Sequence, residues 1–122
     1  MSDTAAFYRD TAVLPEEATL ETLLIGLRGV RTYLTRTRRA IELEHTEAKF
    51  AAVTGASRLL SFLQAITVSD DPNSLGGVLA GLYTSYNVRL TQANAENDTE
   101  ALCAIVEQIG LLEKEIRNLA ER

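Results

Sequence analysis

The chain has 122 residues, of which 46% are hydrophobic and 24% are charged, and its formal net charge is −5 at pH 7. This length suits one domain with a core of its own, and the composition is that of a globular protein rather than a disordered one. The acidic balance argues against a nucleic-acid partner, because proteins that bind DNA or RNA neutralise phosphates with Lys and Arg.

The sequence also carries compartment signals. Cys103 is the only cysteine, so no disulfide can form within the chain. The start of the chain lacks the basic and apolar pattern of a signal peptide. No apolar run approaches the roughly 20 residues of a membrane span. We therefore expect a cytoplasmic protein without a membrane span.

The first predicted element is a long helix that follows a short N-terminal segment, residues 1–14. Phe7 and Tyr8 in that segment are large aromatic side chains that need burial. The helix is predicted to begin at Pro15, a residue suited to the first helical position, and to end near Glu44. Its apolar residues recur at steps of three, four or seven and are Leu20, Leu23, Leu24, Leu27, Val30, Leu34 and Ile41.

The next two predicted helices run from about Glu47 to Val68, with Thr46 as N-cap, and from about Ser74 to Ala95. The loop "SDDPNS" separates them. The apolar stripe of the second helix includes Phe50 and Phe62 and is wide, which indicates neighbours on more than one side. The buried side of the third helix is predicted to hold Leu75, Val78, Leu79, Leu82, Tyr83, Tyr86, Leu90 and Ala93.

The last predicted helix is capped by Asn97, with Glu100 three residues later as the reciprocal partner. Its apolar seam is Leu102, Ile105, Ile109, Leu112, Ile116 and Leu119. Four amphipathic helices joined by short loops predict an all-α fold, an antiparallel up-down-up-down four-helix bundle. We expect one domain over residues 1–122, with residues 1–14 as an N-terminal cap segment or helix.

We expect no catalytic residue, no metal site and no cofactor. Glu42 and His45 have the Glu-x-x-His spacing of di-iron bundles, but such a centre needs that pair twice and the chain has one histidine. A histidine-phosphotransfer bundle that uses His45 remains an alternative, although His45 lies at a predicted helix boundary and no glycine follows it shortly. A structural adaptor that dimerises through its apolar stripe is a further alternative.

Two features of the predicted helices bear on partners. Gly77 and Gly81 are four residues apart on one helical face, where they either let helices of the bundle pack tightly or form a shallow groove for a partner helix. The second feature is a basic run in the first helix, a solvated face that also suits an acidic partner segment: Arg28, Arg31, Arg36, Arg38 and Arg39.

The stretch "LAGLYTSYNVRLTQANAENDTEAL" resembles the signature of FliS, the family of flagellin secretion chaperones. The segments "VLPEEATL" and "AAFYRD" resemble the entry to the family's first long helix and its N-terminal tyrosine segment. Leu14 departs from the family's usual capping serine, and the last helix lacks the usual aromatic residue near its end. The signature positions are Leu79, Leu82, Tyr83, Tyr86, Arg89, Leu90, Ala93, Asn94, Asn97 and Asp98.

The resemblance implies a cytoplasmic export chaperone that binds the C-terminal segment of flagellin, prevents its premature polymerisation and aids its secretion. Export-apparatus components and a second copy of the chain are further partners that it leaves open. Tyr8 is expected to plug the partner groove, and Gly77 and Gly81 to give close approach. The remaining partner-binding residues are expected to be Leu79, Leu82, Tyr83, Tyr86, Arg89, Leu90 and Asn94.

Overall fold

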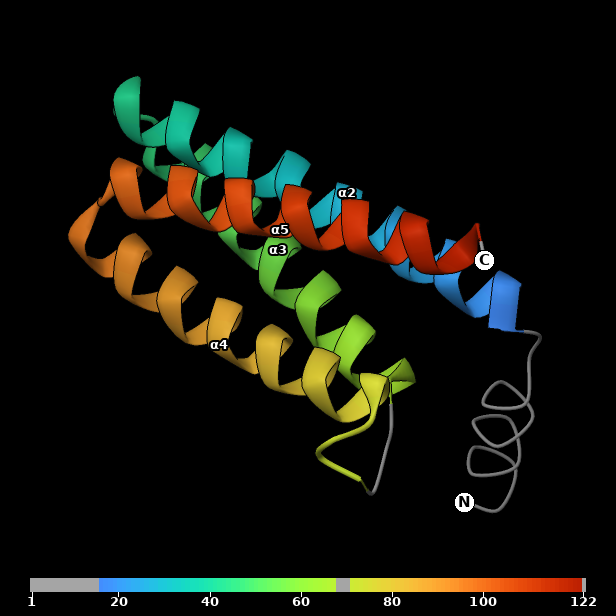
Figure 1. Ribbon diagram of the computed structural model, residues 1–122. Helices are drawn as coiled ribbons and strands as arrows, with labels where there is room; N and C mark the ends of the chain where they lie inside the picture. Colours follow the sequence, from blue (N-terminus) through green and yellow to red (C-terminus); the bar gives the residue numbers. More distant parts are fainter. Residues whose placement is uncertain (1–15, 68–70, 122) are drawn as a thin grey trace, which may run out of the picture.

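The computed structural model describes residues 16–67 and 71–121, which form a bundle of helices (Figure 1). These helices are α2 (Glu16–Glu42), α3 (Thr46–Ile66), α4 (Leu75–Glu96) and α5 (Thr99–Ala120). Successive helices run in opposite directions, and α2 and α4 each pack against both α3 and α5. The predicted all-α four-helix bundle is confirmed. The N-terminal segment 1–14 lies outside the described residues.

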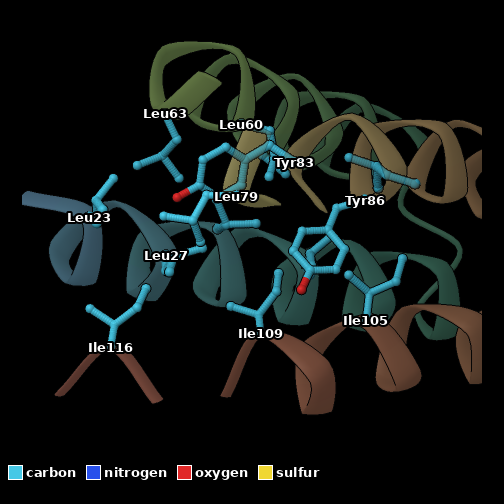
Figure 2. Packing of buried hydrophobic residues seen from close by; sticks show 14 of the residues in the cluster. Leu23, Leu27, Leu60, Leu63, Leu79, Tyr83, Tyr86, Ile105, Ile109 and Ile116 are labelled. Carbon is cyan, nitrogen blue, oxygen red and sulfur yellow. The ribbon is translucent and has the colours of Figure 1, made fainter. Parts of the chain in front are cut away.

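The core forms where one apolar face of each helix meets the other three. Figure 2 shows leucines of α2 and α3, tyrosines of α4 and isoleucines of α5 pointing into one shared interior. Because these side chains repeat at steps of three or four, each helix presents a continuous face to the centre. The largest fully buried apolar side chains are Leu27, Leu34, Leu60, Leu63, Leu79, Tyr83, Leu90, Leu102, Ile105, Ile109 and Ile116.

Glycines bring α2 and α3 into close contact. A Cβ atom added at Gly26 would lie 2.5 Å from Cδ2 of Leu63, and one at Gly29 would lie 2.8 Å from Cδ1 of Leu59. A Cβ atom added at Gly55 on α3 would likewise overlap the ring of Tyr33 from α2. These glycines therefore serve packing within the bundle, since a side chain there would require Leu63, Leu59 or Tyr33 to move.

A partly buried ion pair joins α2 to α5. Glu113 on α5 is 1% exposed, and its two carboxylate oxygens accept hydrogen bonds from Nε and Nη2 of Arg31, the latter at 2.9 Å. Arg117 also lies 3.8 Å from the carboxylate of Glu113. A two-pronged arginine–carboxylate pair of this kind fixes the relative position of its two helices, because it needs one geometry.

The helix ends differ from the prediction in three places. His45, not Thr46, is the N-cap of α3, and α2 ends at Glu42 because Glu44 takes a positive φ of 57°. Asn97 ends α4 in the left-handed conformation, which asparagine tolerates, instead of capping α5. Asp98 caps α5, and its carboxylate accepts a hydrogen bond from the Ala101 N–H at 3.0 Å.

Candidate partner-binding surface

One side of α4 carries apolar residues that face solvent instead of the core. Leu75, Val78, Leu82 and Arg89 follow one another at helical spacing and therefore lie along one flank of the helix. Arg89 at the end of this flank donates a hydrogen bond from Nη1 to Oε1 of Gln108 on α5, at 2.5 Å. The flank therefore lies on the side of α4 that is turned toward α5.

A matching apolar flank lies on α5. Leu111 and Leu119 follow Gln108 by three and eleven residues, which places all three on the same side of the helix. The helices α4 and α5 meet at the turn between them and diverge away from it (Figure 1). The α4–α5 apolar surface is the set Leu75, Val78, Leu82, Leu111 and Leu119.

The exposure of this surface is large for apolar side chains. Leu75 is 45% exposed, Val78 49%, Leu111 65% and Leu119 40%, while Leu82 packs partly against the core. Several large apolar side chains exposed along the facing flanks of neighbouring helices are typical of a binding surface, whereas isolated ones are ordinary. The side chains of the α4–α5 apolar surface are all aliphatic, so the chemistry that this surface offers is contact with an apolar chain segment.

Three of these residues correct the sequence prediction. Leu75 and Val78 were expected on the buried side of α4 and Leu119 in the core seam of α5, yet all three face solvent. The apolar set of α4 is wider than one core face needs, and that excess width is the signal that sequence reasoning missed. Leu111 stands outside every predicted stripe, so spacing alone gave no means of finding it.

Phe50 and Phe62 on α3 also differ from expectation. Both were placed in the wide stripe of that helix, and both are more than half exposed. The ammonium group of Lys49 lies 5.6 Å from the ring centre of Phe50 and covers part of it. The stripe of α3 is therefore narrower than predicted and rests on Ala52, Ala56, Leu60 and Leu63.

Four of the proposed partner-binding residues lie inside the core. Leu79, Tyr83, Tyr86 and Leu90 are each at most 3% exposed. In Figure 2 the hydroxyl of Tyr86 points toward α5, and that of Tyr83 points toward the region of Leu63. They support the α4–α5 apolar surface from beneath, and a direct contact with a partner stays a prediction for them.

The electrostatics of the two tyrosines reflect this burial. Burial raises the pKa of Tyr83 to about 12, and the nearby Thr67 hydroxyl counters only part of that rise. Thr67 donates its own proton to the carbonyl oxygen of Leu63 at 2.6 Å, and the Tyr83 hydroxyl has no hydrogen bond of normal geometry within the described part of the chain. Burial also raises the pKa of Tyr86, while the charge of Arg89 lowers it.

The two candidate glycines of α4 have different surroundings. A Cβ atom at Gly77 would lie 2.7 Å from Cα of Pro72 and even closer to the carbonyl oxygen of Asp71. The close approach at Gly77 is thus made by the loop that precedes α4, where Ser74 Oγ accepts a hydrogen bond from the Gly77 N–H at 3.1 Å. Gly81 has open space around it, with no atom within 4 Å of such a Cβ.

The remaining candidates do not form one cluster. Arg89 faces α5 through Gln108, whereas the backbone of Asn94 lies toward α3, because its main-chain carbonyl oxygen accepts a hydrogen bond from Lys49 Nζ at 3.0 Å. Tyr8 lies outside the described residues. The structure thus brings Leu82 and Arg89 onto the α4–α5 flank and separates Asn94 from it.

His45, the residue of the alternative phosphotransfer site, lies at a helix end. His45 is exposed and stands at the N-cap of α3, outside both neighbouring helices. Over residues 16–67 and 71–121, His, Cys, Asp and Glu side chains do not gather in groups of three that would hold a metal ion. None of the helices in those ranges is long and apolar enough to cross a membrane.

The fold defines the class: an all-α four-helix-bundle protein, here with an apolar flank exposed to solvent. A comparison with protein families matches residues 1–119 to the family described as Flagellar protein FliS. The chain therefore belongs to the FliS family, a family of flagellar export chaperones. No curated protein matches the chain significantly.

Proposed function

We propose that this chain is a cytoplasmic chaperone that binds the disordered C-terminal segment of flagellin and keeps it from polymerising before export. The observation that carries the proposal is the α4–α5 apolar surface, since it leaves large apolar side chains open to an amphipathic segment. Family membership supports the flagellar partner. The proposed action is binding and release without a chemical step.

The size of this surface limits the binding free energy that it can contribute alone. Four of its five side chains are about half exposed, and burying their exposed halves contributes about 3–6 kcal/mol, taking half of the 1.5–3 kcal/mol for full burial. Ordering a disordered segment costs about 2–5 kcal/mol. The α4–α5 apolar surface therefore anchors the segment, and contacts elsewhere on the bundle must supply most of the net affinity.

A pair of substitutions tests the anchor. Val78→Asp and Leu111→Asp should each weaken binding of a flagellin C-terminal peptide by about tenfold or more, because each adds a charge that must be desolvated on binding. Binding is measured by isothermal titration calorimetry. Val88→Asp is the matched control, because Val88 on α4 is 54% exposed and lies between Tyr86 and Leu90, on the side opposite the core.

The assignment itself is tested by co-purification with flagellin of the same genome, intact and without its C-terminal segment. We expect recovery of the intact form only. Equal recovery of both forms would contradict the proposed segment, and equal effects of Val78→Asp and Val88→Asp would contradict the proposed surface. Thermal melts of all variants separate a lost contact from a lost fold.

A further inference from the structure

A groove runs along the seam between α2 and α5. It consists of three adjoining hollows of about 290, 250 and 430 Å³. The first and second share Thr35 and Val106, and the second and third share Arg38, Cys103 and Glu107. The three hollows therefore form one continuous depression.

The groove has a length that suits a helix. It extends along α2 from Arg28 to Glu42, and fourteen residues at about 1.5 Å of rise each give about 21 Å. Its middle is apolar, because Leu34 and Leu102 form the floor with Val106. A helical segment of about fourteen residues with one apolar face fits this length and floor.

The charges along the groove change sign from end to end. The first hollow is lined by Arg28, Arg31 and Arg36 without any acidic residue. The far hollow is lined by Glu42, Glu100 and Glu107, with Arg38 as its single basic residue. A chain whose net charge is −5 thus concentrates positive charge at one end of a single groove.

Two of the arginines are available to a ligand. Arg31 is held by Glu113, and Arg38 lies 3.9 Å from Glu42. Arg28 and Arg36 are exposed and form no ion pair with any residue in the described ranges, and Arg36 rests over the ring of Tyr33 at 5.5 Å. Their positive charge is not neutralised from within the part of the bundle that the structure describes.

We propose that the α2–α5 groove binds a helical protein segment of about fourteen residues that is acidic in its first turn, apolar in the middle and basic in its last turn. The acidic turn meets Arg28 and Arg36, and the basic turn meets Glu100 and Glu107. The segment lies parallel to α2. This charge order agrees with the preference of any helix for acids at its N-terminus and bases at its C-terminus.

The charge reversal within the groove decides between classes of partner. Nucleic acid and anionic membranes present negative charge along their whole extent, so the acidic end at Glu42, Glu100 and Glu107 would repel them. A short helix with charges of opposite sign at its two ends is attracted at both ends of the groove. The groove therefore fits a protein partner.

Two synthetic peptides of fourteen residues test the proposal with the full chain. Both have the same composition, the same apolar face and the same side-chain staple that holds them helical. One has Glu in the first turn and Lys in the last, and the other has these charges exchanged. Fluorescence anisotropy at low salt should show binding of the first peptide at least about tenfold tighter than the second.

Charge variants of the protein locate the binding. Arg28→Glu combined with Arg36→Glu should weaken the first peptide by about tenfold or more, whereas Arg58→Glu, an exposed position on α3, should change it less than about twofold. Arg28→Gln with Arg36→Gln should give an intermediate loss if the reversed pair fails to fold. Binding of the flagellin peptide should be unchanged in these variants, so this test is independent of the proposed chaperone function.

Three outcomes would overturn the proposal. The first is equal affinity for the two peptides, and the second is an equal effect of the Arg28/Arg36 and Arg58 variants. The third is binding to anionic vesicles or single-stranded DNA that is stronger than peptide binding and is lost in the Arg28/Arg36 variant.

Discussion

At the scale of single residues, Tyr83 shows how a polar atom is kept inside the core. Its ring fills space between α3 and α4, and its hydroxyl is buried without a hydrogen bond of normal geometry to any described residue. An unsatisfied buried hydroxyl costs free energy, because it has lost its bonds to water. Burial of the Tyr83 ring stabilises the fold, whereas burial of its hydroxyl oxygen destabilises it.

This environment predicts a pH dependence of stability. The pKa of Tyr83 is about 12 in the folded chain against an ordinary value of 10, so the unfolded chain releases its proton first. The contribution of this group is fully present below pH 10 and is lost as the pH rises toward 12, by about 2–3 kcal/mol in all. Urea unfolding between pH 8 and pH 12 measures this loss.

Tyr83→Phe is the matched substitution. It should leave the chain as stable as before or up to about 1–2 kcal/mol more stable at pH 7, because it removes the unsatisfied oxygen and keeps the ring. The fall in stability above pH 10 should become shallower, with a remainder from Tyr86, whose pKa is also raised by burial. A strong loss of stability at pH 7 would show that the hydroxyl has a partner after all.

At the scale of elements, α4 carries glycines with opposite roles. Gly77 lies against the backbone of Asp71 and Pro72, and its N–H is bonded to the capping Ser74. Gly81 has no atom within 4 Å of the position of a Cβ. One glycine is therefore required by the loop that enters the helix, and the other leaves an open place on its surface.

Alanine substitutions should separate these roles. Gly81→Ala should stabilise the chain by up to about 1 kcal/mol, because alanine is the better helix former. Gly77→Ala should destabilise it by about 1–3 kcal/mol, because the backbone it meets cannot turn aside as a flexible side chain does. Thermal and urea unfolding of both variants measure the difference, and similar effects of the two would contradict the assigned contacts.

Glycines also bring the helices α2 and α3 close to each other. Gly26 and Gly29 on α2 and Gly55 on α3 each receive a side chain of the other helix, namely Leu63, Leu59 and Tyr33. By contrast, α4 and α5 meet at the turn and diverge from it. Close packing on one side of the bundle and divergence on the other leave apolar residues exposed on the second side.

At the scale of the whole molecule, the N-terminal segment gives the sharpest prediction. Phe7 and Tyr8 precede the bundle in the sequence, and we propose that their segment occupies the partner groove when no partner is bound, because an attached segment acts at high effective concentration. Deleting residues 1–9 should therefore raise the association rate of a flagellin C-terminal peptide and promote self-association of the free chain. Stopped-flow mixing and analytical ultracentrifugation measure the two effects.

Thermal melts are the control for that deletion. A segment packed permanently into the core would give a lower melting temperature and no faster association. Unchanged or slower association would defeat the plug while leaving the chaperone assignment in place. Slower association together with a melting temperature equal to that of the full chain would instead place the segment among the residues that bind the partner.

Much of the fold was determined by the sequence alone. The steps of three and four among the apolar residues of α2 and α5 define one apolar face each, and burial of these faces against one another favours a bundle. The signature from Leu79 to Leu102 placed the chain in its family, and the match over residues 1–119 confirms this. Local patterns and family signatures need no knowledge of the neighbouring helix.

Other features were decided only by the tertiary structure. Val78 and Leu119 follow the same local spacing as buried residues, yet they are exposed because α4 and α5 diverge where these side chains lie. The α2–α5 groove joins arginines of one helix to glutamates of another that is sixty or more residues away in the chain. Exposure and charge pairing between helices depend on the distance and angle at which the helices pack, and spacing within one helix carries no information about either.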